Sequence, residues 1–176
     1  DERTSLIVTS NRNQIANAFA TTIPNNMVVY YKGGIEFLDK SASSSWIDTL
    51  SSHEISHVYQ LNVKSRLGSA LKKVFGNQDY VALPLVPVPI FIAPTLFLPT
   101  FLVEGNAVLN ESKLNQGGRL FSGDYLVMAT ELINSGQADL NFIMNHHLQF
   151  PFGSEKYIVG GYFQSSLSNR YSFDTI

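Results

Sequence analysis

The chain has 176 residues, of which 44% are hydrophobic and 15% charged, and its formal net charge is −2. These values fit one globular domain with its own core and exclude a disordered chain. The absence of cysteine excludes disulfides, zinc ribbons and thiol catalysis. The densest cationic group fits the solvated face of a helix better than a nucleic-acid surface, so no nucleic-acid partner is expected. It consists of Lys64, Arg66, Lys72 and Lys73.

The N-terminal third predicts a small layer of strands followed by one long helix. Residues 6–9 and 27–31 are β-branched and aromatic runs typical of strands. Between them, Ile15, Ala18 and Phe19 recur at helical spacing. A serine cluster at 41–45 supplies a loop and an N-cap. Apolar and histidine side chains then recur in steps of three and four, which predicts a helix to about Asn62: Trp46, Leu50, His53, His57 and Leu61.

A long apolar segment follows a short cationic helix expected between Gly68 and Gly76. Residues 80–103 carry no charge, yet they contain five prolines, each of which removes a backbone donor. An extended loop folded over the domain is therefore the preferred interpretation. A surface that contacts a membrane or a hydrophobic partner is the second, and a membrane-spanning helix the third. The rest of the chain predicts helices at about 100–113, 123–135, 138–149 and 156–170.

The motif with the clearest chemistry is the HExxH sequence of residues 53–57. Two histidines four residues apart on a helix project side by side, so both imidazoles can bind one Zn²⁺. The metal lowers the pKa of its bound water toward about 7, and Glu54 lies where it can accept the proton. We therefore expect His53 and His57 as zinc ligands and Glu54 as the general base.

A catalytic zinc usually has a third protein ligand, and Glu104 is the candidate. It stands near the start of a predicted helix directly after the apolar segment, which is an unusual place for a solvated carboxylate. Glu111 lies two turns further along the same face, where it could accept a hydrogen bond from a ligand histidine. The alternative for Glu104 is a carboxylate that stabilises the helix start through the macrodipole.

These residues together resemble the gluzincin metallopeptidases, which include thermolysin and the zinc aminopeptidases. More narrowly, residues 53–60, 75–76, 101–111 and 117–119 are similar to bacterial secreted metalloprotease domains that often precede a β-propeller. The resemblance implies zinc held by His53, His57 and Glu104, with Glu54 as general base and Glu111 behind the ligands. It also implies a secreted, periplasmic or cell-envelope location, and we expect the chain to be a fragment or a processed part of a longer protein.

Amide hydrolysis also needs a donor for the developing oxyanion. Residues 157–160 resemble the Y-x-x-G segment that supplies such a tyrosine in zinc aminopeptidases, so Tyr157 is the first candidate. His146 and His147 are the alternatives, because an imidazolium could act as the donor. A tyrosine that only fills the core is the remaining interpretation of Tyr157.

The expected fold is a single α+β zincin-like domain, with a strand layer over the active-site helix and a mostly helical C-terminal half. Residues 27–31 are the candidate edge strand for binding an extended substrate. The expected function is zinc-dependent hydrolysis of peptide bonds in a peptide or protein substrate. The alternative is a non-catalytic module that binds metal and uses residues 80–103 to contact a membrane or a hydrophobic partner.

Overall fold

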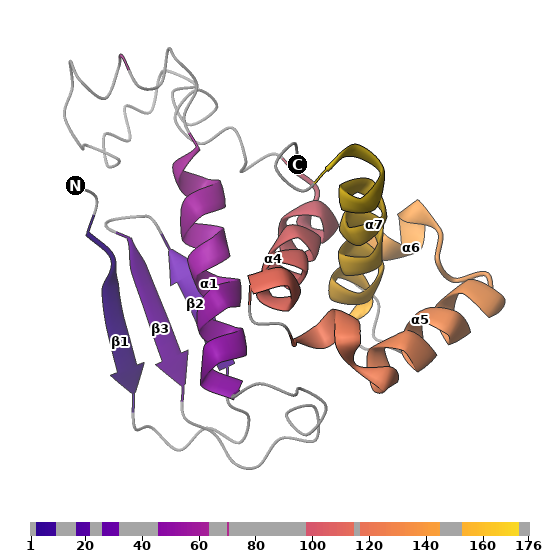
Figure 1. The fold of residues 1–176 in the computed structure, drawn as a ribbon, viewed down its shortest axis with the longest axis horizontal. Helices are drawn as coiled ribbons and strands as arrows, with labels where there is room; N and C mark the ends of the chain where they lie inside the picture. The colour runs from indigo at the N-terminus through magenta and orange to yellow at the C-terminus, as the bar shows by residue number, and fades with distance from the viewer. Residues whose placement is uncertain are drawn as a thin grey trace. The chain divides into compact units, whose positions relative to one another are not determined.

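The computed structural model describes residues 3–9, 17–21, 26–31, 46–63, 70, 98–114, 117–144 and 153–172. The described part of the chain is α+β and mostly helical, with one three-stranded sheet and five α-helices (Figure 1). It divides into two compact units, one formed by Asp1–Gly34 with His57–Leu98 and the other by Ile35–Ser56 with Pro99–Ile176. The division falls within the long helix α1, Trp46–Asn62.

The sheet of the first unit has the strand order β1-β3-β2. Strand β1, Ser5–Thr9, is parallel to β3, Met27–Tyr31, with Ser5 opposite Met27. Strand β2, Asn17–Thr21, is antiparallel to β3 on its other side, with Thr21 opposite Met27. The strands at both predicted positions are confirmed.

The prediction that residues 27–31 form the substrate-binding edge is wrong, because β3 is the central strand of the sheet. Its backbone groups pair with β1 on one side and β2 on the other, so no row of free donors and acceptors remains for another strand. Val28 and Tyr30 are buried, as expected for a central strand. Sequence pattern identifies a strand by its local composition, whereas its position in the sheet depends on partners elsewhere in the chain.

The helical spacing around Ala18 and Phe19 is also misleading, because residues 17–21 form β2. Ala18 is buried while Phe19 is exposed, which is the alternation of a strand that lies against a neighbour. Three apolar residues, Ile15, Ala18 and Phe19, are too few to distinguish the periodicity of a helix from that of a strand. Residues 17–21 form a strand because they pair with β3.

Helix α1 matches the predicted helix at its C-terminal end. Its last residue, Asn62, donates a hydrogen bond from Nδ2 to Oδ1 of Asn26 at 2.9 Å, next to β3. The same Nδ2 donates to the carbonyl of Val58 at 2.8 Å. The side chain of Asn62 therefore fixes the final turn of the helix to the residue that precedes β3.

The second unit contains the remaining four α-helices. Helices α4, Thr100–Leu114, α5, Gly123–Asn134, and α7, Glu155–Tyr171, confirm three predicted helices, and a 3-10 turn, η3, Arg119–Phe121, precedes α5. Helix α6, Leu140–Met144, confirms the start of the fourth. The core of the second unit lies where α5 packs on α7, and it consists of Tyr125, Ala129, Leu132 and Ile158.

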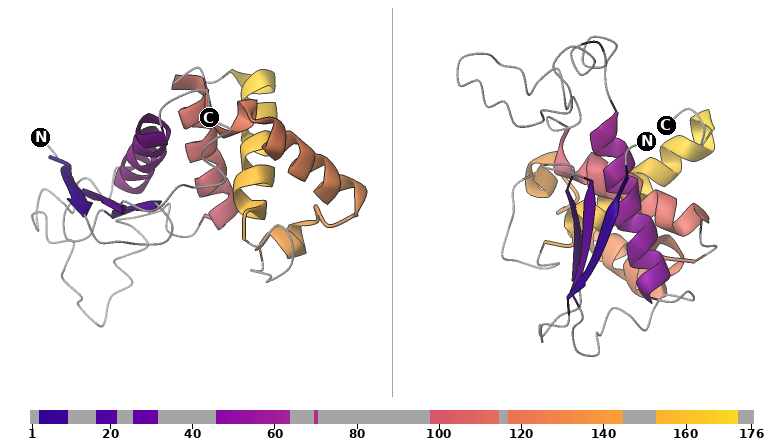
Figure 2. Two further views of the ribbon diagram at one scale, coloured as in Figure 1. Left: turned by 90° about the horizontal axis from the view of Figure 1, so that it is seen from below. Right: turned by 90° about the vertical axis from the view of Figure 1, so that its left-hand side faces the viewer.

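Helices α4 and α7 lie side by side (Figures 1 and 2), and a glycine of each helix, Gly105 and Gly160, lies at their contact. A Cβ atom added to Gly105 would collide with the backbone of Gly160, and one added to Gly160 would collide with the carbonyl oxygen of Phe101. The two backbones are therefore in direct contact. Glu104 precedes the first of these glycines and Tyr157 lies one turn before the second, so the contact brings two candidate site residues to one place.

We expect Gly160→Ala to destabilise the protein although alanine is the better helix former. Alanine gains about 1 kcal/mol of helix propensity, but overpacking against rigid backbone costs roughly 1–3 kcal/mol and occasionally more. Thermal unfolding should give a lower Tm. Gly123→Ala is the matched control, because a Cβ there meets open space. Equal melting temperatures for the two variants would contradict the backbone contact.

Several sequence predictions fall outside the described residues. They are the N-cap at 41–45, almost all of the cationic helix after Gly68, the apolar segment up to residue 97, and residues 145–149 of the fourth helix. In the described ranges, no helix has both the length and the apolar character that a membrane crossing requires.

Candidate metal centre

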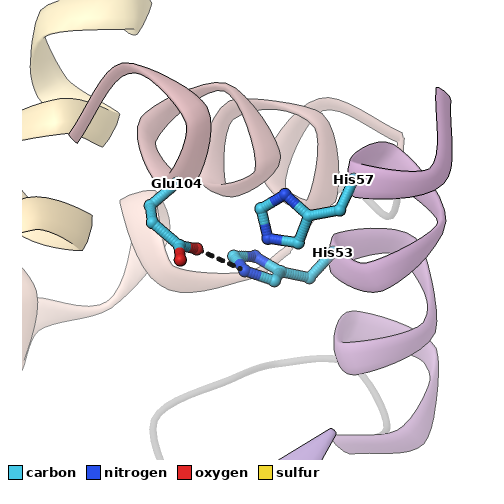
Figure 3. A group of neighbouring side chains, drawn as sticks. All are labelled: His53, His57 and Glu104. Carbon is cyan, nitrogen blue, oxygen red and sulfur yellow. Dashed lines mark hydrogen bonds and ion pairs between the residues drawn. The ribbon is translucent and has the colours of Figure 1, made fainter. Parts of the chain in front are cut away.

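Helix α1 carries three candidate site residues on consecutive turns. His53 and Glu54 are buried, with 3% and 5% of their surfaces exposed, and His57 is half-buried. The spacing of four residues places the two imidazoles one above the other on the same side of the helix (Figure 3). The HExxH sequence is thus fully helical, as predicted.

Helix α4 contributes the carboxylate of Glu104 to the same place. One ligand atom from each of His53, His57 and Glu104 lies within 4.8 Å of the others, and the three side chains point toward one another (Figure 3). Within this cluster, Nε2 of His53 and Oε2 of Glu104 are 3.2 Å apart. The structure therefore brings together the three predicted ligands from positions 53, 57 and 104.

Both histidines are held through the ring nitrogen that does not face this cluster. Nδ1 of His53 lies 2.9 Å from Oε2 of Glu111, and Nδ1 of His57 lies 3.1 Å from Oε1 of Gln60. An acceptor oxygen at Nδ1 favours the tautomer that carries its proton there, which leaves the Nε2 lone pair available to a metal. This is the arrangement that orients ligand histidines in zinc sites.

The donor set fits a divalent metal such as zinc. Two ligands at 2.0–2.1 Å from one tetrahedral ion are separated by about 3.3 Å, close to the spacing between His53 and Glu104. His53 also has a carboxylate oxygen at each ring nitrogen. With the proton on Nδ1, the lone pair of Nε2 faces a carboxylate oxygen, and a metal cation bound between the two atoms would interact favourably with both.

Glu111 lies behind His53 as a fully buried ion-pair partner of Arg119. Nε of Arg119 donates to Oε1 at 2.7 Å and Nη2 donates to Oε2 at 2.6 Å, which is a bidentate (two-pronged) ion pair. Burial alone would raise the pKa of the Glu111 carboxyl, but the hydrogen bonds from Arg119 and then His53 outweigh it and lower the pKa to about 2. Glu111 is therefore an anion at neutral pH and can accept the proton of His53.

Tyr157, in the first turn of α7, lies beside the cluster of candidate metal ligands. Its ring centroid is 5.9 Å from that of His53. Burial raises the pKa of its phenol above the usual value, and the charges of Glu104 and Glu54 add to this, while Arg119 opposes it. The phenol therefore keeps its proton at neutral pH and can act as a hydrogen-bond donor.

The two alternative donors, His146 and His147, lie outside the described residues. Two other residues at the site were not identified as site residues from the sequence. Arg119 belongs to the Gly117–Arg119 sequence noted above, but its partner could not be read from it. Tyr125 has the pattern of an ordinary core residue on α5, and no local feature of the sequence distinguishes it. Its hydroxyl accepts a hydrogen bond from Arg119.

Comparison of the chain with protein-family models, curated proteins and solved structures finds no match.

Proposed function

We propose that this chain is a zinc-dependent peptidase with a zincin-like fold, in the manner of the gluzincins. The observation that carries the proposal is the cluster of His53, His57 and Glu104, with ligand atoms within 4.8 Å of one another. The HExxH helix and a glutamate from a second helix are the ligand arrangement that this class uses. Glu54 adds the carboxylate that a purely structural metal site does not need.

In the hydrolysis of an amide bond, three residues at the site would each have a separate role. Bound zinc would supply a Lewis acid that polarises the substrate carbonyl and makes water more acidic. Glu54 would accept a proton from the attacking water and pass it to the leaving amine. Tyr157 would donate a hydrogen bond to the carbonyl oxygen as negative charge develops on it. Glu111 would keep His53 in the tautomer that binds metal.

The proposal is tested by measuring metal content and hydrolysis on the same preparation. We expect about one zinc per chain by elemental analysis and cleavage of a denatured protein substrate such as casein. A chelator should abolish cleavage and added zinc should restore it. A chain that holds stoichiometric zinc without cleaving any of a panel of peptides and proteins would be a non-catalytic metal-binding module instead.

Tyr157→Phe is expected to lower kcat and kcat/KM together while KM and zinc content stay nearly unchanged. The change removes a donor that acts mainly in the transition state, and the loss of one such donor costs about 10²- to 10³-fold. Tyr162→Phe, on the same helix, is the matched control and should keep full activity. Unchanged turnover of a well-folded Tyr157→Phe protein would move the role to His146 or His147.

A further inference from the structure

Arg119 is the shared neighbour of three residues around the candidate metal centre. Its guanidinium binds Glu111, donates to the hydroxyl of Tyr125 and lies 5.1 Å from the centroid of the Tyr157 ring. These partners come from α4, α5 and α7. The proposed hydrolysis gives Arg119 no part, and its contacts suggest a role in positioning.

Arg119 supplies most of the hydrogen bonds that fix the carboxylate of Glu111. Oε1 accepts from Nε at 2.7 Å and from the backbone N–H of Arg119 at 3.2 Å, and Oε2 accepts from Nη2 at 2.6 Å. A guanidinium bound through two nitrogens sets the plane of the carboxylate as well as its position. The remaining partner of Oε2 is Nδ1 of His53, at 2.9 Å.

The same guanidinium restricts the ring of His53. Nη2 of Arg119 lies 2.6 Å from Nδ1 of His53, and the two nitrogens lie 2.6 and 2.9 Å from Oε2 of Glu111. Arginine has no acceptor, so a protonated Nδ1 can place its hydrogen only on the carboxylate. The ring then keeps the orientation in which Nε2 faces Glu104.

The backbone on both sides of Arg119 is held in place. Gly118 has φ 95°, a conformation that L side chains rarely adopt, and a Cβ there would lie 3.1 Å from Oγ of Ser112. The backbone N–H of Leu120 donates to the same Oγ at 3.2 Å. Arg119 therefore lies between two residues, Gly118 and Leu120, whose backbone is held against Ser112 of α4, unlike an arginine on a free surface.

We propose that Arg119 is a positioning residue of the metal centre, which holds Glu111 so that His53 presents Nε2 to the metal. The inference rests on the proposed zinc function, and it assigns to Arg119 control of metal affinity and ligand geometry. Because lysine keeps the charge but cannot form the two-pronged contact, Arg119→Lys separates orientation from electrostatics.

The test is a double-mutant cycle with Glu111→Gln, read out as zinc affinity in chelator competition. Arg119→Lys should weaken zinc binding by about 10- to 100-fold, the range typical of partners behind the ligands. If Arg119 acts through Glu111, the same change should have much less effect in the Glu111→Gln background. Full chains loaded with Co²⁺ give a second readout, because the visible absorption of cobalt reports ligand geometry and should change in Arg119→Lys.

Arg170→Lys is the matched control, since Arg170 also lies near a tyrosine ring, that of Tyr171 at 5.8 Å, but is exposed. It should leave zinc affinity and the cobalt spectrum unchanged. If Arg119→Lys fails to fold, the variant Tyr125→Phe tests the inference instead. It removes a partner of Arg119 and leaves Glu111 unchanged, and it should weaken zinc binding several-fold.

Two results would overturn the inference while leaving the zinc function intact: wild-type zinc affinity in Arg119→Lys, or an equal loss in both backgrounds of the cycle. A lower melting temperature of the metal-free variant with unchanged affinity and cobalt spectrum would likewise reduce Arg119 to a structural ion pair. A wild-type chain that binds no zinc would instead refute the proposed function itself.

Discussion

Glu54→Gln is expected to stop peptide hydrolysis while the protein keeps its zinc. Glutamine has nearly the same size and can occupy the same buried position, but it cannot accept and return a proton. General-base catalysis contributes about 10²- to 10⁴-fold, so kcat should fall by this factor with little change in KM. Steady-state kinetics on a fluorogenic peptide, together with elemental analysis, measures both quantities.

The matched control for this variant is Glu131→Gln on the exposed side of α5, which should be fully active. The two variants must contain the same amount of zinc, because only then does a difference in kcat report the loss of proton transfer. Residual activity near the wild-type level in a zinc-loaded Glu54→Gln protein would contradict the role of Glu54 as general base.

His57→Ala is expected to abolish stoichiometric zinc binding and, with it, hydrolysis. The variant removes one of three ligands from the cluster, and two protein ligands are too few for the usual catalytic site. The metal-free protein should remain folded, because His57 is half-buried and its side chain is partnered by Gln60 in its own helix. Elemental analysis after dialysis and thermal unfolding of the metal-free chain check the two expectations.

His53→Ala should lose zinc too, but with an additional loss of stability that His57→Ala lacks. His53 is 3% exposed and donates to the fully buried Glu111, so its removal leaves a cavity and takes a partner from a buried anion. The double variant His146→Ala/His147→Ala is the control for histidine loss and should keep its zinc. If the His57→Ala variant kept its full zinc content, His57 would not be a zinc ligand.

The sequence was most informative where structure and chemistry depend on local spacing. Helices α1, α4, α5 and α7 follow from apolar residues at steps of three and four, and the HExxH spacing places two histidines together on any continuous helix. Glu104 could be selected because a carboxylate directly after an apolar stretch is unusual. These features require no knowledge of distant contacts.

The features that could not be predicted depend on contacts between elements distant in the sequence. The central position of β3 and the strand at residues 17–21 result from strand pairing, which residue composition does not specify. The roles of Arg119 and Tyr125 arise only when α4, α5 and α7 have packed together. Before packing, a cation after two glycines and an aromatic residue on a helix have many equally ordinary interpretations.

The glycine contact between α4 and α7 has a consequence for mutational scanning. A screen that scores only activity should find Gly105 and Gly160 about as intolerant as the metal ligands, although neither has a side chain that could bind zinc. A parallel screen for abundance would separate the two groups. Variants at the glycines should disappear from the folded pool, whereas variants at His57 should accumulate as inactive, metal-free protein.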